Sequence, residues 1–294
     1  RGRYEDAVNE SKKALELAEM RKLKLKDFLV SFYIISAGNY EKGRLKEAET
    51  YALKAVELDN NFLDGYCVLS FVYDSLKSYD RFFQVSENYL KLWNEIVKYP
   101  ERFPAYTFHT MGHKWRIHLC RGFNYLIRKQ EEEANFELER AIQESFGITT
   151  CLKLLGNFYL ENNYLDKAEE TFARLLNAQE QSEEVLFKIG LVKFKKRSFE
   201  EAIVYWRKAV EKEPSLFDIR LMICKMNVIL EKFEEVITDC NQLLNELNLS
   251  RNVTLESFTD LSALFKTIGE RLNEMHDLPA AETAFEICED LKRL

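Results

Sequence analysis

The sequence has few of the residues that make turns. Only ten glycines and four prolines occur among its 294 residues, which is well below average usage. An all-β protein needs turn residues about every ten positions, so this scarcity argues against a β-sandwich or a barrel. Leu, Lys, Glu and Ala are abundant instead, and these residues favour helices. We therefore predict an all-α fold.

The sequence also lacks a positive charge balance and a long apolar stretch. Its net charge is −7, from 42 Lys and Arg against 49 Asp and Glu, whereas a general nucleic-acid binder carries a basic surface. The uncharged run 28–40 has thirteen residues, and crossing a bilayer takes about 20. No signal-peptide pattern opens the sequence. We expect a cytoplasmic protein with neither nucleic acid nor membrane as its partner.

Paired cysteines and catalytic motifs are missing as well. None of the six cysteines forms a C-x-x-C pair, so a disulfide scaffold or a zinc ribbon is not supported. Phosphate-binding glycine loops, the H-E-x-x-H zinc motif and Asp-x-Asp pairs do not occur, which argues against an enzyme. We expect no catalytic activity and no cofactor.

Three of the four histidines lie close together, at His109, His113 and His118. His109 and His113 are four residues apart and would share one helix face. His118 would point about 140° away from His113 around the same helix, so one helix cannot bring all three to a metal ion. We therefore predict no metal site and expect these histidines to pack or to face solvent.

What the sequence does contain is an internal period. Successive positions of one pattern are separated by 41, 34, 52, 34, 34, 34 and 45 residues; they are Ala7, Ala48, Phe82, Ala134, Ala168, Ala202, Val236 and Ala281. A repeat of fixed length with insertions is typical of a solenoid. Small residues recur twelve positions earlier, at Ser36, Ser70, Gly122, Gly156, Gly190, Cys224 and Gly269. Small side chains allow two helices to approach closely, so the pattern predicts packed helical hairpins.

Two units carry a family resemblance most clearly. One is the run 155–159, Leu-Gly-Asn-Phe-Tyr, followed by Ala168; the other is Gly190 followed by Phe199, Ala202, Trp206, Ala209 and Pro214. These units resemble the tetratricopeptide repeat, a helix-turn-helix of about 34 residues, and the resemblance extends over almost the whole chain. It implies a right-handed α-solenoid of about seven such hairpins plus one N-terminal half-repeat, with an elongated hairpin around 80–130.

The repeats divide the chain into five parts. Residues 1–25 form the second helix of a truncated repeat, so we expect the natural polypeptide to continue upstream. Residues 101–145 form the elongated hairpin, because 18 additional residues lengthen two facing helices on either side of Pro100 and Pro104. We expect this hairpin to protrude and to divide the solenoid into two lobes. The other parts are repeats at 26–100, three regular repeats at 146–246 and a C-terminal repeat at 247–294.

The resemblance also implies that the first helix of each hairpin lines a concave groove. The candidate binding residues on these helices are Tyr33, Tyr40, Phe71, Asp74, Phe123, Lys153, Asn157, Lys188 and Lys195. Lys153 and Asn157 match family members that clamp a peptide carboxylate, an interaction of charge-assisted hydrogen bonds. Lys188, Asp218 and Met222 depart from that pattern. We therefore expect a more general groove for an acidic peptide, with solvated lysines as the alternative.

The stretch 105–130 has cations and aromatic residues but no acidic residue. Such a mixture can bind phosphates and stack on bases. An amphipathic helix explains it more simply, with the aromatics in the core and the cations paired to Glu131, Glu132 and Glu133. Arg121 stands where this family usually has an apolar residue.

The leading hypothesis for function is a non-catalytic protein–protein interaction scaffold that binds a peptide or protein segment in its concave groove. Two alternatives remain. One is the accessory repeat region of a larger bacterial enzyme such as a glycosyltransferase, and the other is an RNA-binding helical repeat protein. The ends of the solenoid also expose apolar faces, so we expect self-association through them.

Overall fold

A computed structural model describes residues 2–103, 108–145, 147–178, 182–232, 235–236, 238–239, 255–274, 281–282, 284–286 and 288. These residues form helices joined by short turns, and no β-strand occurs among them. The predicted all-α solenoid fold is therefore confirmed. The chain divides into two compact units, residues 1–151 and 152–294.

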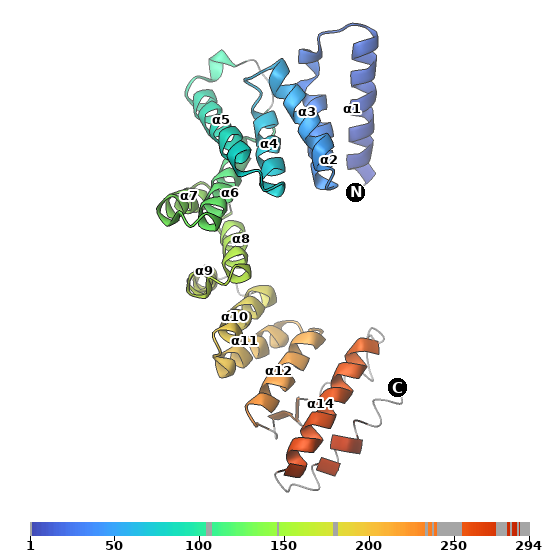
Figure 1. Cartoon of the computed structure of the whole chain (residues 1–294), viewed down its shortest axis with the longest axis vertical. Helices are drawn as coiled ribbons and strands as arrows, with labels where there is room; N and C mark the ends of the chain where they lie inside the picture. The colour runs from blue at the N-terminus through green and yellow to red at the C-terminus, as the bar shows by residue number, and fades with distance from the viewer. Residues whose placement is uncertain are drawn as a thin grey trace. The chain divides into compact units, whose positions relative to one another are not determined.

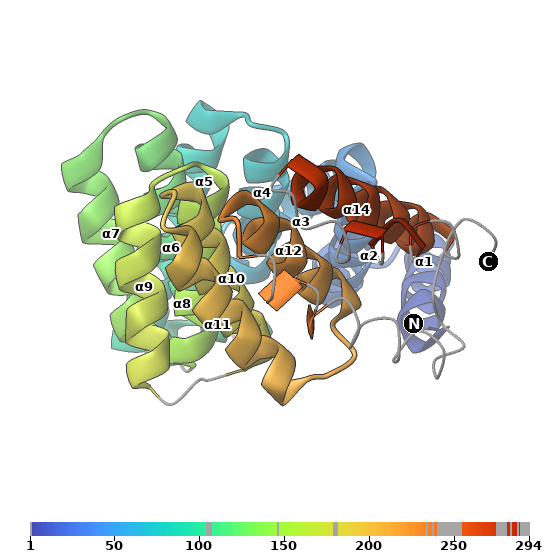
Figure 2. The ribbon, with the colours of Figure 1, turned by 90° about the horizontal axis from the view of Figure 1, so that it is seen from below.

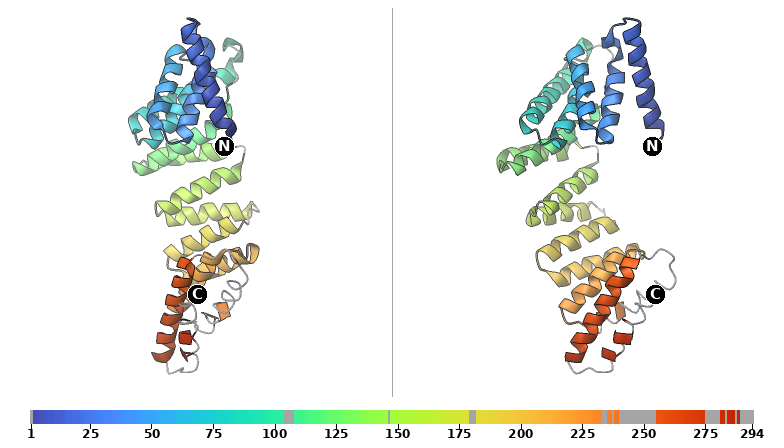
Figure 3. Two further views of the ribbon diagram at one scale, coloured as in Figure 1. Left: turned by 90° about the vertical axis from the view of Figure 1, so that its right-hand side faces the viewer. Right: turned by 45° about the vertical axis from the view of Figure 1, so that its right-hand side comes forward.

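The first unit consists of helical hairpins that follow one another along the chain (Figures 1 and 3). Helix α2 packs on α3, α4 on α5 and α6 on α7, and the unpaired helix α1 packs on α2. The elements are α1 (Gly2–Met20), η1 (Leu25–Phe28), α2 (Leu29–Glu41), α3 (Leu45–Leu58), α4 (Leu63–Ser75), α5 (Tyr79–Lys98), η2 (Pro100–Arg102), η3 (Met111–His113), α6 (Lys114–Ile127) and α7 (Glu131–Glu144).

The second unit continues the same pattern, and Figure 2 shows α10 beside α11. Its elements are α8 (Ile148–Glu161), which begins just before the unit boundary, α9 (Leu165–Asn177), α10 (Glu183–Lys195), α11 (Phe199–Lys212), α12 (Phe217–Ile229) and α14 (Leu255–Glu274). The C-terminal repeat predicted over 247–294 is described only in part. Most of its second helix lies outside the described residues, as does most of the end of the third regular repeat, up to residue 246.

The periodic positions form the interface inside each hairpin. From residue 48 onward all of them are buried: Ala48, Phe82, Ala134, Ala168, Ala202, Val236 and Ala281. The small residues twelve positions earlier face large side chains of the second helix. A Cβ atom at Gly156 would lie 2.8 Å from Cε1 of Phe172, and one at Gly190 would overlap the indole of Trp206. Large rings thus fill the space that the missing side chains leave, and the predicted close approach is confirmed.

Left-handed residues close the hairpin turns. Positive φ occurs at Gly43 (71°), Lys77 (55°), Lys129 (59°), Asn163 (63°) and Arg197 (64°). Helices commonly end with such a residue, and glycine is the usual choice. In this glycine-poor chain lysine, arginine and asparagine take most of these places, and a cation there complements the negative end of the helix dipole. Lys77, Lys129 and Arg197 therefore place a positive charge outside a helix end, whereas Glu231 (58°) places a negative charge after α12.

Only one of the two helices of the predicted elongated hairpin, around 80–130, is elongated. Helix α5 has 20 residues, but α6 has 14 and begins at Lys114 rather than near residue 104. The chain between them contains two short 3₁₀ turns, Pro100–Arg102 and Met111–His113, while Pro104 lies outside the described residues. Asp64 supplies the physical reason, because it binds residues 109 and 110 and draws this segment back onto α4. The chain divides into its two units between residues 151 and 152, after this hairpin.

Buried charges join α6 to α7. The guanidinium of Arg121 donates to Glu137 (Nε–Oε1 2.7 Å), and Nδ1 of His118 lies 2.5 Å from the other oxygen of that carboxylate. Lys114 pairs with Glu144 at 2.9 Å. The prediction that Arg121 and Lys114 pair with Glu131–Glu133 is therefore wrong. Burial raises the pKa of Glu137, but the hydrogen bond from His118 and the charge of Arg121 outweigh it and hold the pKa below its usual value.

The Gly190–Trp206 contact gives a first testable prediction. Gly190→Ala should destabilise the chain by about 1–3 kcal/mol, because the added methyl forces the fully buried Trp206 ring to move. This cost exceeds the roughly 0.5–1 kcal/mol that alanine gains over glycine inside a helix. Thermal unfolding followed by circular dichroism measures the effect. Gly112→Ala is the control, since nothing lies within 4 Å of its added Cβ, and an equal midpoint for both variants would contradict the packing argument.

The Glu137 cluster gives a second prediction, on pH dependence. Glu137→Gln leaves the buried Arg121 with only the more distant, half-buried Glu87 at 3.6 Å as its countercharge and should cost about 3 kcal/mol at pH 7. Because the folded pKa lies below the ordinary value of 4.5, the stability that ionised Glu137 provides is present above that pH and is lost as pH falls through the folded pKa. Urea unfolding midpoints should therefore converge between wild type and variant below about pH 4.5. The exposed Glu139→Gln on the same helix should show no such gap, and a gap that is independent of pH would rule out the ionic explanation.

Candidate peptide-binding surface

In the first unit, aromatic side chains from the first helices of two hairpins meet. A cation from the first helix of a third hairpin lies over one of these rings. Tyr40 on α2 and Phe71 on α4 have ring centres 6.2 Å apart, and the guanidinium carbon of Arg116 on α6 lies 5.0 Å from the centre of the Phe71 ring. His113 meets the edge of Phe71 at 6.3 Å. We name Tyr40, Phe71, His113 and Arg116 the aromatic face. The structure thus brings together two of the predicted site residues and adds two that the sequence analysis did not assign to it.

A third predicted residue, Tyr33, is stacked against the chain's own segment 108–113. The rings of Tyr33 and His109 are parallel within 3°, with centres 5.4 Å apart. Phe108 packs into the apolar clusters beside it. One face of Tyr33 is therefore occupied, and Tyr33 lies at the border of the aromatic face.

Asp64 fixes the segment 108–113 on α4. This fully buried carboxylate accepts hydrogen bonds from the Thr110 amide (2.9 Å), the Thr110 hydroxyl (2.6 Å) and the His109 amide (3.1 Å). Burial raises the pKa of Asp64, and the three hydrogen bonds oppose that rise without cancelling it. Tyr89 donates to the Thr110 carbonyl at 2.6 Å, and Trp93 donates to the Met111 carbonyl at 3.0 Å. The positions of His109 and His113 are therefore set by a buried polar network.

Asp74 and Phe123 lie further along the same row of first helices. Asp74 Oδ1 accepts from the amide of Asn124 on α6 at 2.7 Å. This bond joins two neighbouring hairpins, which gives Asp74 a structural task besides any contact with a guest. Phe123 is half-buried on α6.

Positive charge on the aromatic face comes from Arg116. Burial first, and the charge of Arg116 second, lower the pKa of His113, so this imidazole is largely neutral at pH 7. Its Nδ1 lies 3.7 Å from Sγ of the buried Cys67, and burial raises the pKa of that thiol far above its usual range. Arg116 is exposed. The face therefore offers flat apolar rings beside one accessible guanidinium.

The predicted lysines lie on first helices of the second unit, as expected. Lys153 and Asn157 are one turn apart on α8, and Lys188 and Lys195 are seven residues apart on α10. Lys195 is exposed, and its ammonium donates to the carbonyl of Leu160 at 3.3 Å. The Oδ1 atom of Asn157 is buried and accepts no hydrogen bond in the part of the chain that the structure describes.

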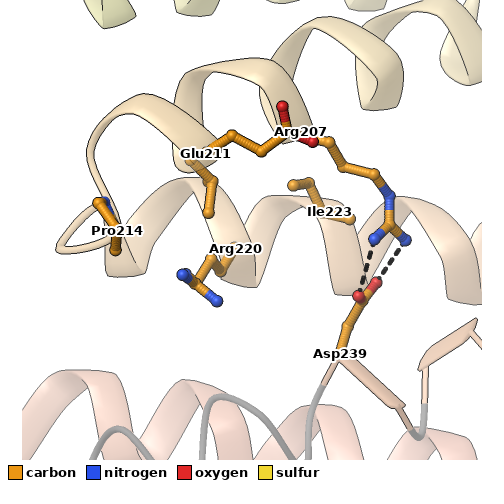
Figure 4. A pocket seen from close by; sticks show the side chains of 7 residues that line it. Arg207, Glu211, Pro214, Arg220, Ile223 and Asp239 are labelled. Atoms are coloured by element: carbon orange, nitrogen blue, oxygen red, sulfur yellow. Dashed lines mark hydrogen bonds and ion pairs between the residues drawn. The ribbon is translucent and has the colours of Figure 1, made fainter.

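A separate pocket of about 300 Å³ opens between α11 and α12 (Figure 4). Arg207 donates to both carboxylate oxygens of Asp239, at 3.0 and 2.8 Å, and Asn227 donates to the same carboxylate at 3.2 Å. Arg220 lies away from this pair in the picture, near Pro214. Asp239 thus neutralises Arg207, one of the two arginines that line the pocket.

The described residues contain neither a candidate metal-binding group nor a candidate membrane-spanning helix. No group of three or more potential metal-binding side chains occurs there. None of the helices described combines the length and apolar character of a membrane span.

Comparisons with known proteins agree with the architecture. A family model for the tetratricopeptide repeat matches residues 39–62. The C-terminal part of a repeat protein from Cytophaga hutchinsonii superposes with a TM-score of 0.60 at 13% identity, covering 88% of this chain and 95% of that one. The type IV pilus biogenesis factor PilW gives a TM-score of 0.51 at 15% identity, covering 76% and 95%. PilF from Pseudomonas aeruginosa gives 0.50 at 17% identity, also covering 76% and 95%.

No curated protein sequence matches the chain. One segment of the chain, residues 39–62, matches the tetratricopeptide repeat, and the chain shares the fold of solved tetratricopeptide-repeat proteins.

Proposed function

We propose that the chain is a non-catalytic scaffold that binds an extended peptide segment across the aromatic face of its first unit. The observation that carries this proposal is the arrangement of Tyr40, Phe71 and Arg116, which come from three consecutive hairpins. A surface built from three repeats presents contacts along a line, and an extended segment can follow that line. Binding without covalent chemistry also agrees with the general role of this repeat family.

The chemistry of the face defines the guest. Tyr40 and Phe71 offer rigid rings against which an apolar side chain can pack, and aromatic residues and arginine supply much of the affinity at protein interfaces. The exposed guanidinium of Arg116 can hold a carboxylate in a bidentate hydrogen bond while it stays over the Phe71 ring. The favoured guest is a segment with an apolar anchor next to an acidic residue.

The lysines of the second unit extend this proposal to a more acidic segment. Lys153, Lys188 and Lys195 provide positive charge on the first helices α8 and α10. Such groove charges contribute to selectivity and association rate more than to affinity.

We place this scaffold in the cytoplasm. Cys67, Cys151, Cys224 and Cys288 are free and buried, and Cys120 is free and half-buried, which suits a reducing compartment. Self-association through the ends of the repeat array remains part of the proposal, and Leu17 and Met20 of α1 are exposed apolar side chains at one end.

A peptide-display selection on the whole chain tests the aromatic face. Peptides enriched on wild type should carry an apolar residue beside Asp or Glu. Their dissociation constants, measured by fluorescence anisotropy, should rise at least tenfold for Phe71→Ala and for Arg116→Ala, because an anchor ring or a charge-assisted bond is lost.

The first unit offers a matched control for that experiment. On α7 the exposed Phe136 carries Arg140 with its guanidinium carbon 4.7 Å from the ring centre, so the double variant Phe136→Ala/Arg140→Ala removes the same chemistry from another surface. Its affinity should stay within about twofold of wild type. Equal losses in both variants, or an unchanged affinity for the Phe71 and Arg116 variants, would remove the aromatic face as the binding site.

A second selection with acidic peptides tests the lysines. The triple variant Lys153→Ala/Lys188→Ala/Lys195→Ala should bind acidic peptides more weakly, with most of the difference disappearing at high salt because the contacts are electrostatic. Anisotropy titrations at two salt concentrations measure this. The variant Lys208→Ala/Lys212→Ala/Lys232→Ala removes equal charge from the same unit and serves as the control. The solvated-lysine alternative predicts the same affinity for both triple variants.

A further inference from the structure

The first unit contains a cavity of about 550 Å³ at the place where two hairpin turns come together. It is lined by Lys77, Ser78, Tyr79, Asp80, Arg81 and Arg128, and we name it the basic pocket. Lys77 and Ser78 come from the turn between α4 and α5, the next three residues form the first turn of α5, and Arg128 comes from the turn between α6 and α7. The basic pocket shares no residue with the aromatic face, so an inference about it is independent of the proposed peptide binding.

Positive charge in the basic pocket is only partly neutralised. Arg81 pairs with Glu49 at 3.2 Å, and Asp80 is the only acidic residue of the lining. Lys77 and Arg128 form no ion pair with any carboxylate of the described residues. Arg128 keeps its guanidinium carbon 5.5 Å from the centre of the Phe83 ring, which leaves its N–H groups available. In a chain of net charge −7, two unpaired cations in one cavity indicate a site for an anion.

Backbone geometry adds to this charge. Lys77 has a φ of 55°, and the hydrogen bonds Lys77 N to Asp74 O (3.1 Å) and Ser78 N to Tyr73 O (2.9 Å) hold the turn. Helix α5 begins at Tyr79 and runs for 20 residues, so the positive end of its dipole lies at the cavity. The first amide with a helical partner is that of Phe82, which donates to Ser78 O. The amides before it belong to the first helical turn, where N–H groups have no partner within the helix.

A cation just after a helix complements the negative end of that helix, and this accounts for Lys77 after α4 and for Arg128 after α6. It does not account for the two turns bringing both cations to one cavity. The hydroxyl groups of Ser78 and Tyr79 add two further donors.

We infer that the basic pocket binds the compact dianion of a phosphate monoester. A guanidinium, an ammonium, hydroxyl groups and a helix N-terminus together match the several acceptor oxygens of a phosphate better than the two of a carboxylate. The group that carries the phosphate is either a small metabolite or a phosphorylated side chain of a partner protein, and the cavity volume exceeds what the phosphate alone fills.

The test uses the whole chain and phenyl phosphate as the probe. Isothermal titration at fixed ionic strength should show saturable binding to wild type, with benzoate binding at least fivefold more weakly. The variant Lys77→Gly/Arg128→Gln removes both unpaired cations, and glycine suits the positive φ at position 77, so this variant should fold normally. It should bind phenyl phosphate at least tenfold more weakly than wild type, while its circular dichroism spectrum and unfolding midpoint stay close to those of wild type.

Lys24→Ala/Lys54→Ala removes two exposed cations of the same unit that do not line the cavity, and it should bind phenyl phosphate like wild type. A phosphoserine peptide with alanine flanks distinguishes the two sources of phosphate. Affinity at least tenfold above that of phenyl phosphate identifies a protein partner, and equal affinity identifies a small ester. The inference is overturned if no probe binds wild type, if benzoate binds as well as phenyl phosphate, or if both double variants lose affinity equally.

Discussion

Close contact between the two helices of a hairpin is the constraint on which the rest of this structure depends. At Gly190 the absence of a side chain gives room to the indole of Trp206, and Gly156 does the same for Phe172. A hairpin packed in this way still has an apolar side that it cannot bury alone, so the next hairpin must cover it. First helices consequently lie beside first helices, as α2 does beside α4 and α4 beside α6. The meeting of Tyr40, Phe71 and Arg116 follows from that order.

Buried polar groups fix the path of the chain at the insertion between α5 and α6. Asp64 accepts three hydrogen bonds from two residues of the inserted segment, and losing such bonds in a buried place costs about 1–3 kcal/mol each. Glu137 combines His118 and Arg121 in one cluster between α6 and α7. Hydrophobic contacts are not directional, whereas these hydrogen bonds allow one arrangement only. The insertion therefore has a defined path although it is not a long helix.

The sequence analysis predicted the features that follow from the repeat. It missed those that depend on contacts between residues far apart in the sequence. Among the described residues, the hairpins predicted from the spacing are present, and the periodic positions Ala48, Ala134 and Ala202 are buried on their second helices. Helix α6 begins ten residues later than expected, because the decisive contact joins Asp64 to Thr110, 46 positions apart, and no local pattern reveals it.

The candidate site also has parts that the repeat predicts and parts that it does not. Placing Tyr40, Phe71 and Asp74 on first helices required only the repeat, whereas the roles of His109 and His113 required the path of the insertion. An acidic residue inside the apolar run Phe62-Leu63-Asp64-Gly65-Tyr66-Cys67-Val68 was the one available signal. The basic pocket needed still more, since Lys77 and Arg128 belong to turns of different hairpins and no period relates them.

The inserted segment sets a limit on what the first unit can accommodate. The segment lies on Tyr33 and Asp64, so the row of accessible aromatic rings ends there on the α2 side. For the guest that we propose at Phe71, this boundary would limit the length of peptide that can dock on the α2 side.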